Sequence, residues 1–240
     1  MWTIAYYQPA ALFSLKTAAA TSSGGKTLLC PTPFAIKMAL LDAALRTQPR
    51  ASVAPVWKEL RDLAIKIRLP EKIAVVNTFT KIVRPKKHGA SDDSGTGLLT
   101  PLGSTIAYRE YVSFGGAIGL ALQTARGEPL PAQLHELFQH INYFGKRGSF
   151  VQLLGPPEVV TDQAVADDQG WTTLTLNQPS FNLSGTLQLL DDCGPKLTLE
   201  QVDIYSGKRM SLGKDRILRH IVLPYRMTRS GRGFSLYERI

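Results

Sequence analysis

The residues best suited to chemistry lie in the run Asn142–Phe150, where Lys146 and Arg147 stand between Gly145 and Gly148. Glycines let the backbone turn tightly and approach a ligand, while lysine and arginine carry donors that match phosphate oxygens. The pattern therefore predicts a phosphate-binding turn of the kind that contacts a nucleic-acid backbone. A glycine-capped helix followed by two solvated cations is the structural alternative, because both features are common at helix ends.

Two other patterns are weaker candidates for a site. The segment Gly24–Thr27 ends like a P-loop, but Ala20 occupies the position of that motif's first glycine and no strand leads into it, so nucleotide hydrolysis is rejected. His135 and His140 lie five apart on an expected helix, roughly 140° round its axis, which is poor geometry for sharing a metal ion. We expect neither a metal nor a cofactor.

A third candidate, His88, follows Lys86 and Lys87 in a polar segment. An imidazole there could deprotonate a ribose 2′-hydroxyl while the lysines stabilise the charged transition state, which is metal-independent RNA cleavage. The alternative is an electrostatic contact, since a cationic patch on a loop commonly binds phosphate without cleaving it. No paired-carboxylate, serine-nucleophile or cysteine-nucleophile arrangement stands out.

Composition favours a globular protein with a polyanionic partner. The 240 residues are 44% hydrophobic, carry a formal charge of +9 and have a pI near 9.6. Basic blocks at 1–120 and 206–240 flank an acidic block at 155–205, so one face is expected to meet nucleic acid. In the last block arginines and lysines alternate with aromatic residues, which predicts either a surface for phosphates and bases or a basic strand edge that resists aggregation.

Cysteine usage and hydropathy indicate a cytoplasmic protein. Cys30 and Cys193 make neither a disulfide framework nor a zinc site, which suits a reducing compartment. The N-terminus has no basic region before an apolar core, and no apolar run approaches the roughly 20 residues that span a bilayer. We expect a protein with no membrane partner.

Periodicity predicts an α+β protein. A ferredoxin-like domain is expected over 1–154, in the order β, α, β, β, α, β with an extra helix after the first. Thr32 is expected to cap the first helix, with Lys37 among its few solvated residues. The expected elements are a strand Trp2–Gln8, helices Pro33–Arg46 and Pro55–Ile67, a strand Ile73–Val83, one or two strands in Thr105–Leu122, a helix Pro131–Phe144 and a strand Phe150–Leu154.

Two further segments complete the expected architecture. Arg84–Gly97 is too polar and glycine-rich to pack, so a projecting, mobile thumb loop is expected at about 84–104. Residues 155–240 are expected to be β-rich with no clear helix. Strands are predicted there in Trp171–Leu176, Phe181–Leu190, Leu197–Tyr205, Arg219–Leu223 and Phe234–Tyr237.

In this order the segments resemble the fifth CRISPR-associated (Cas) protein family of the RNA-binding RAMP superfamily, which caps the guide RNA (crRNA) 5′ handle in type I surveillance complexes. A first strand and a Ser/Gly/Lys-containing loop lead to a proline-led helix, Cys30–Leu41. Arg84–Gly97 stands where the family inserts a hairpin or thumb. Tyr108–Val112 is similar to its Arg-Glu-aromatic strand, and Phe144–Ser149 to its glycine-basic turn.

The resemblance implies a non-catalytic RNA-binding subunit of a Cascade-like complex. It would hold the crRNA 5′ handle, contact the backbone and large subunits, and lie near target DNA through the complex. The residues implied in RNA binding are Lys26, Lys37, Lys81, Arg84, Lys86, Lys87, Tyr108, Arg109, Gly145, Lys146, Arg147 and Gly148. A minority of the family cleaves its precursor RNA, so His88 with Lys87 remains the alternative catalytic pair. A ferredoxin-like RNA-binding module outside CRISPR is a further alternative.

Overall fold

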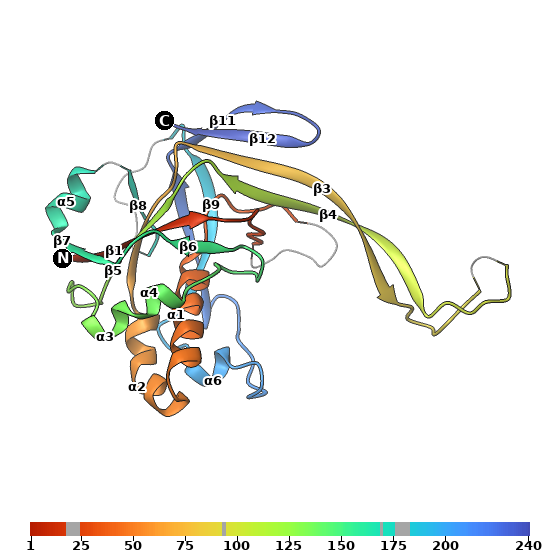
Figure 1. Cartoon of the computed structure of the whole chain (residues 1–240), viewed down its shortest axis with the longest axis horizontal. Helices are drawn as coiled ribbons and strands as arrows, with labels where there is room; N and C mark the ends of the chain where they lie inside the picture. The colour runs from red at the N-terminus through yellow and green to blue at the C-terminus, as the bar shows by residue number, and fades with distance from the viewer. Residues whose placement is uncertain (18–24, 93–94, 169, 176–182) are drawn as a thin grey trace.

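The computed structural model describes residues 1–17, 25–92, 95–168, 170–175 and 183–240 (Figure 1). Most of the loop expected before Lys26, and parts of the strands expected in Trp171–Leu176 and Phe181–Leu190, lie outside these ranges. Among the described residues strand outweighs helix, and the paired strands of all three sheets are antiparallel. A mixed α and β fold with antiparallel sheets is confirmed.

The largest sheet has the strand order β6-β1-β5-β2-β8, with β7 also paired to β1. Tyr7 on β1 lies inside the molecule, and its hydroxyl donates a hydrogen bond of 2.9 Å to the Phe138 carbonyl. This bond ties the sheet to the segment that carries the glycine-basic turn. The strands are β1 (Trp2–Pro9), β2 (Ala64–Arg68), β5 (Ile118–Gln123), β6 (Val151–Leu153), β7 (Glu158–Val160) and β8 (Trp171–Thr173).

The proline-led helix is confirmed as α1 (Pro33–Thr47). The Thr32 side chain accepts a hydrogen bond of 3.1 Å from the Ala35 amide, and Pro33 occupies the first turn, where its missing N–H costs nothing. Apolar residues such as Ile36 and Leu40 are fully buried in the main core. The cap and the apolar face together explain why the helix begins where it does.

Lys37 on α1 contradicts the expectation of a solvated side chain. It is only 2% exposed, and its Nζ lies 2.6 Å from Asp192 Oδ1. Arg219 Nε donates to the other oxygen of the same carboxylate at 2.8 Å. The sequence shows an apolar face on only one side of α1, but a strand pair that includes Asp192, 155 residues after Lys37, covers the other side. Lys37 is therefore left out of the RNA surface proposed below.

The second helix begins and ends earlier than expected. It forms α2 (Arg50–Arg61) in place of Pro55–Ile67, so the expectation of helix up to Ile67 is wrong. Ile65 and Ile67 are buried and alternate with more exposed neighbours in β2, which is the two-residue period of a strand. The β-branched isoleucines favour that strand, and its pairing with β5 overrides the helical reading.

The helix expected over Pro131–Phe144 is also broken. It appears as two single turns, α3 (Ala132–His135) and α4 (Leu137–His140). The argument from helical angle about the two histidines therefore does not apply. His135 Nε2 lies 2.9 Å from the Leu130 carbonyl, a contact within the fold.

A second sheet has the order β11-β12-β3-β4 and sends a long hairpin out of the body (Figure 1). Pairing of β3 with β4 runs without interruption from Ile73 opposite Phe114 to Pro85 opposite Leu102. Regular strand therefore continues past Arg84, where a loop was expected to begin. The members are β3 (Lys72–Pro85), β4 (Leu102–Phe114), β11 (Tyr225–Ser230) and β12 (Phe234–Arg239).

The third sheet pairs β9 (Thr186–Cys193) with β10 (Arg216–Leu223). Two helices, α5 (Asp162–Asp167) and α6 (Leu199–Val202), contradict the expectation of no helix in this part of the chain. The strand expected over Leu197–Tyr205 is likewise wrong. Thr198 and Gln201 form a reciprocal capping box, a signal for a helix that was present in the sequence.

One main core contains residues from both sides of the expected domain boundary at residue 154, including Leu40, Ile67, Leu190 and Tyr225. The boundary itself stays a prediction. Cys30 and Cys193 are free, buried thiols, and burial raises the pKa of each to about 12. Within the described ranges no helix is both long and apolar enough to cross a membrane.

Breaking the buried pair between α1 and β9 should destabilise the fold strongly. Asp192→Ala leaves the Lys37 ammonium buried without its partner, and we expect the free energy of unfolding to fall by about 3–5 kcal/mol. Urea denaturation measures the change. Lys72→Ala is the control, because its pair with Glu238 at 3.2 Å is exposed and worth about 0–1 kcal/mol. Equal losses in the two variants would contradict the structural role of the buried pair.

Candidate nucleic-acid interface

The glycine-basic turn links α4 to β6 and has a backbone that its glycines permit. Gly145 and Gly148 have φ angles of +74° and +102°, a region that side chains disfavour. The Ser149 amide donates to the Lys146 carbonyl at 3.1 Å, and Tyr143 bridges to Phe150. The turn is therefore closed at its base, and the side chains of Lys146 and Arg147 are exposed at its end.

Buried residues on either side hold the turn in place. Phe144 is fully buried and packs edge to face on Tyr7, with ring centroids 5.4 Å apart. Ser149 is 1% exposed, and its hydroxyl accepts a hydrogen bond from the Ser14 amide at 3.2 Å. The cations thus project from a rigid base, which lowers the entropy lost when they bind a ligand.

Lys146 is part of a cluster of cations from three separate segments. Burial lowers the pKa of Lys16, and the nearby charges of Arg109 and Lys146 lower it further. Neither Lys16 nor Lys146 forms an ion pair with any described residue. Like charges held this close are expected where an anion will neutralise them.

The same turn borders a cavity of about 370 Å³. Its lining includes the apolar side chains of Leu15, Leu28 and Met38 and the cations Lys16 and Lys146. Arg216 lies over the Phe34 ring at 4.3 Å and pairs with the buried carboxylate of Asp191. A hollow lined by both apolar and cationic side chains has the chemistry that a nucleotide needs, since the base is flat and apolar and the phosphate is anionic.

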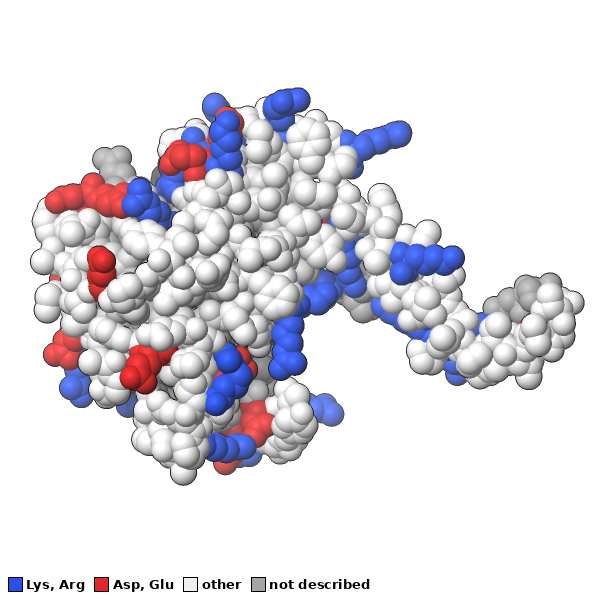
Figure 2. Space-filling view, in the orientation of Figure 1, with Lys and Arg blue, Asp and Glu red and all other residues white. Residues whose placement is uncertain are grey.

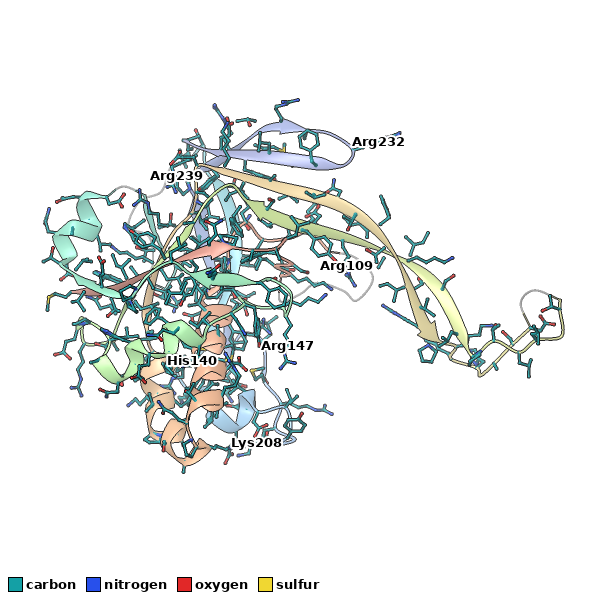
Figure 3. All side chains as sticks on the ribbon, viewed as in Figure 1. Arg109, His140, Arg147, Lys208, Arg232 and Arg239 are labelled. Carbon is teal, nitrogen blue, oxygen red and sulfur yellow. The ribbon has the colours of Figure 1, made fainter. Side chains whose placement is uncertain are left out.

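Figure 2 shows Lys and Arg side chains along the edge of the body that faces the β3–β4 hairpin and along the hairpin itself. Acidic side chains gather at the opposite end, around α5 and the N-terminus. In Figure 3, Arg109, Arg147 and Lys208 lie along that same edge. A hydrogen bond to Tyr143 raises the pKa of Arg147 above the ordinary arginine value, which is itself well above neutral pH. Arg147 is therefore always charged. The angle between body and hairpin is therefore lined by positive charge.

The implied RNA-binding residues are not all brought together. Lys26 is exposed near the cluster, since the adjacent Thr27 amide donates to Glu110 of β4 at 2.7 Å. Tyr108 and Arg109 lie on β4, and the Tyr108 hydroxyl donates to Glu110 at 3.1 Å. Lys81, Arg84, Lys86 and Lys87 lie farther out along the hairpin, and the Lys86 ammonium donates to Ser91 and Thr100 within the connection.

His88 is exposed in the connection at the far end of the hairpin, well away from the glycine-basic turn (Figure 1). The two candidate RNA-contacting regions are thus separated by the length of the hairpin. Cleavage by His88 and Lys87 stays a prediction from sequence.

Lys16 is a part of this surface that sequence reasoning missed. Lys16 lies in a segment whose backbone pairs with Thr27 and Leu28 across the loop, and no periodic pattern marks it. Lys208 and Arg216 belong to the C-terminal basic block, which the sequence predicted either as a surface for phosphates and bases or as a basic strand edge. Only the packing of β10 beside α1 places Arg216 over Phe34, so no local signal could have shown its position.

Comparison with known proteins places the chain beside CRISPR-associated proteins. No family model matches it. The CRISPR-associated protein Cas5 of Archaeoglobus fulgidus is 24% identical over 214 residues, which are 87% of this chain and 85% of that protein. The chain therefore resembles the fifth CRISPR-associated family, as its motifs predicted.

Two solved structures align with this chain over most of its length. A chain of a CRISPR RNA-guided surveillance complex has a TM-score of 0.50 at 11% identity, covering 93% of this chain and 91% of its own length. A crystal structure of a CRISPR protein from Archaeoglobus fulgidus has a TM-score of 0.46 at 13% identity, covering 100% and 92%. The first of these shows a shared fold.

Removing the charge of Lys146 should raise the pKa of Lys16, because it relieves one of the two repulsions that lower it. The expected result for Lys146→Gln is an upward shift of the Lys16 titration, followed by NMR of the lysine side chains. Lys196→Gln, which removes a charge that does not act on Lys16, is the control and should leave the titration in place. A Lys16 pKa that is the same in both variants would show that the two ammonium groups are not neighbours.

The turn should also need glycine at its second corner. Gly148→Ala forces a side chain into the left-handed region, and we expect a loss of about 1–2 kcal/mol in the free energy of unfolding. Gly155→Ala is the matched control, since an added methyl group there meets open space without a positive φ. The prediction is wrong if chemical denaturation gives the two variants the same stability.

Proposed function

We propose that this chain is a non-catalytic RNA-binding subunit of a CRISPR surveillance complex, in which it holds the 5′ handle of the guide RNA. The observation that carries the proposal is the convergence of Lys16, Arg109 and Lys146, two of which, Lys16 and Lys146, line a cavity that also has apolar walls. Resemblance to a Cas5 protein and the fold shared with a chain of an RNA-guided surveillance complex support it.

The strand order of the largest sheet supports a ferredoxin-like assignment within this proposal. Taking β1, β2, β5 and β6 as the four strands, the order β6-β1-β5-β2 places the first strand between the fourth and the third. The helices α1 and α2 connect β1 to β2, and α3 and α4 connect β5 to β6. On this assignment the glycine-basic turn precedes the fourth strand.

The β3–β4 hairpin then has the role of the thumb. On the face that continues from Ile73 and Val75 it carries Phe79 and Ile106, which are 75% and 69% exposed, with Lys81 directly opposite Ile106 in the register. Such a surface suits contact with neighbouring subunits of the complex, and Arg84 and Lys87 would meet RNA along it. The backbone and large subunits are the proposed protein partners, and target DNA would lie nearby through the complex.

The double variant Lys146→Ala/Arg147→Ala tests the grip on RNA. If both cations contact phosphates of a single strand, the slope of log affinity against log salt should fall by about 1.4. Fluorescence anisotropy with a handle RNA over a range of salt concentrations measures the slope. Lys58→Ala/Lys196→Ala is the control, because these cations lie away from the turn and should leave the slope unaltered.

A preparation of the assembled complex provides the second readout. RNA that co-purifies with the wild-type subunit should have one uniform 5′ sequence, and the Lys146→Ala/Arg147→Ala variant should retain less of it. Heterogeneous 5′ ends, or no RNA in the presence of the partner subunits, would contradict the proposal that this subunit holds the 5′ handle. Cleavage of repeat RNA by the purified chain in EDTA would replace the non-catalytic proposal with the nuclease alternative.

A further inference from the structure

The solvent-facing side of the β11-β12-β3-β4 sheet has features that the proposed function does not use. On its inner side Ile73, Val75, Val112 and Phe114 are buried in the main core. Because side chains alternate along a strand, the residues between them face outward. The outer face of β3 and β4 therefore presents Ala74, Val76, Tyr111 and Ser113, all of them partly exposed.

An irregularity in β11 brings two arginines to this same face. Arg226 and Arg229 are three residues apart, so in a regular strand they would point to opposite sides. The pairing shifts by one residue between Met227 and Arg229, with Arg226 opposite Glu238 and Arg229 opposite Leu236. Glu238 and Leu236 are two apart on β12, so both arginines share their face.

Two aromatic residues lie in one row across the sheet. Phe234 is paired with Val76, and Val76 with Tyr111, so the two rings stand on either side of one strand. At about 4.8 Å between strands they are about 10 Å apart. Phe234 is 40% exposed, and the neighbouring row of Leu236, Ala74 and Ser113 includes two small residues that let a ligand approach the sheet.

Three arginines of the β11–β12 hairpin, Arg226, Arg229 and Arg232, are exposed and form no ion pair within the described part of the chain. Arg239 of β12, in contrast, pairs with Glu71 at 3.3 Å. The turn that carries Arg232 is held on β3, since Asn77 donates hydrogen bonds to the Arg232 and Gly233 carbonyls at 3.2 and 2.8 Å. The positive charge is therefore displayed from a fixed position.

Protection of an edge strand accounts for only part of this pattern. Cations on β11, the outermost strand, would deter pairing with another chain. That purpose does not require the exposed ring of Phe234 on β12 or the partly exposed ring of Tyr111 on β4. Strand β4 is at the opposite edge of the sheet from β11. Cations beside a row of aromatic rings have the chemistry of a surface that binds phosphates and stacks bases.

We propose that the outer face of the β11-β12-β3-β4 sheet binds single-stranded nucleic acid without regard to sequence. Arg226 and Arg229 neutralise phosphates, while Phe234 and Tyr111 each stack on a base. A single strand is the occupant because a duplex hides its base faces from a flat sheet. Figure 3 shows Arg232 on the other side of the β3–β4 hairpin from Arg147, so this surface is separate from the glycine-basic turn.

The test is made on the full chain carrying Lys146→Ala/Arg147→Ala, so that the outcome does not depend on the guide-RNA proposal. In this background Arg226→Ala/Arg229→Ala should reduce the salt slope for a single-stranded oligonucleotide of mixed sequence by about 1.4. Phe234→Ala should weaken binding about 5- to 150-fold, the range that one stacked base supplies, while Phe234→Tyr keeps the ring and should retain affinity. Lys58→Ala/Lys196→Ala is the matched charge control.

Crosslinking keeps the test independent of how well each variant folds. A single-stranded oligonucleotide containing 5-iodouridine should crosslink to Phe234 or Tyr111 of the protein whose β4 and β12 sequences are unchanged. Mass spectrometry maps the crosslinked residues. Crosslinks confined to other segments would overturn the proposal. So would a blunt duplex that binds as tightly as the single strand, or an affinity that neither Phe234→Ala nor the arginine pair alters.

Discussion

The buried contact between Lys37 and Asp192 determines how the two ends of the chain fit together. Both side chains are almost fully enclosed, and Arg219 shares the same carboxylate. A buried pair of this kind gives little net stability, because desolvation of the two charges offsets their attraction, but a displaced partner is costly. Displacing α1 against the β9–β10 pair would leave buried charges without partners, so the contact favours the observed alignment of these elements.

That alignment has consequences for the candidate site. It places Arg216 over Phe34 and beside Asp191, and so forms one wall of the cavity that the glycine-basic turn borders. Two residues of the acidic block form ion pairs here, because Asp191 pairs with Arg216 and Asp192 pairs with both Lys37 and Arg219. Cations elsewhere, such as Lys16 and Lys146, form no ion pair within the described ranges and give the surface its positive charge. Cations with acidic partners, such as Lys37, stabilise the fold, whereas cations without an ion pair are available to bind a polyanion.

Sequence signals that act over a few residues, such as a helix cap or a pair of glycines, correctly predicted the elements that they start or turn. Thr32 and Pro33 marked the start of α1, and the glycine spacing around Lys146 anticipated a turn that the structure shows with two positive φ angles. The errors have physical reasons as well. Ile65 and Ile67 adopt the strand that pairing with β5 imposes, and α6 begins at a capping box that β-like composition obscured. Where a segment is short, its partner in the sheet outweighs its own propensity.

The amino-acid sequence by itself determined the basic character of the protein, its mixed α and β class, the proline-led helix and the glycine-basic turn, because these depend on composition and on neighbours a few residues apart. Only the tertiary structure decided that Lys37 is buried, that Lys16, Arg109 and Lys146 converge, and that Arg226 and Arg229 share a face. Each of these depends on long-range pairing or on a one-residue shift in register. Such relations join residues that are distant in the chain, so no local pattern encodes them.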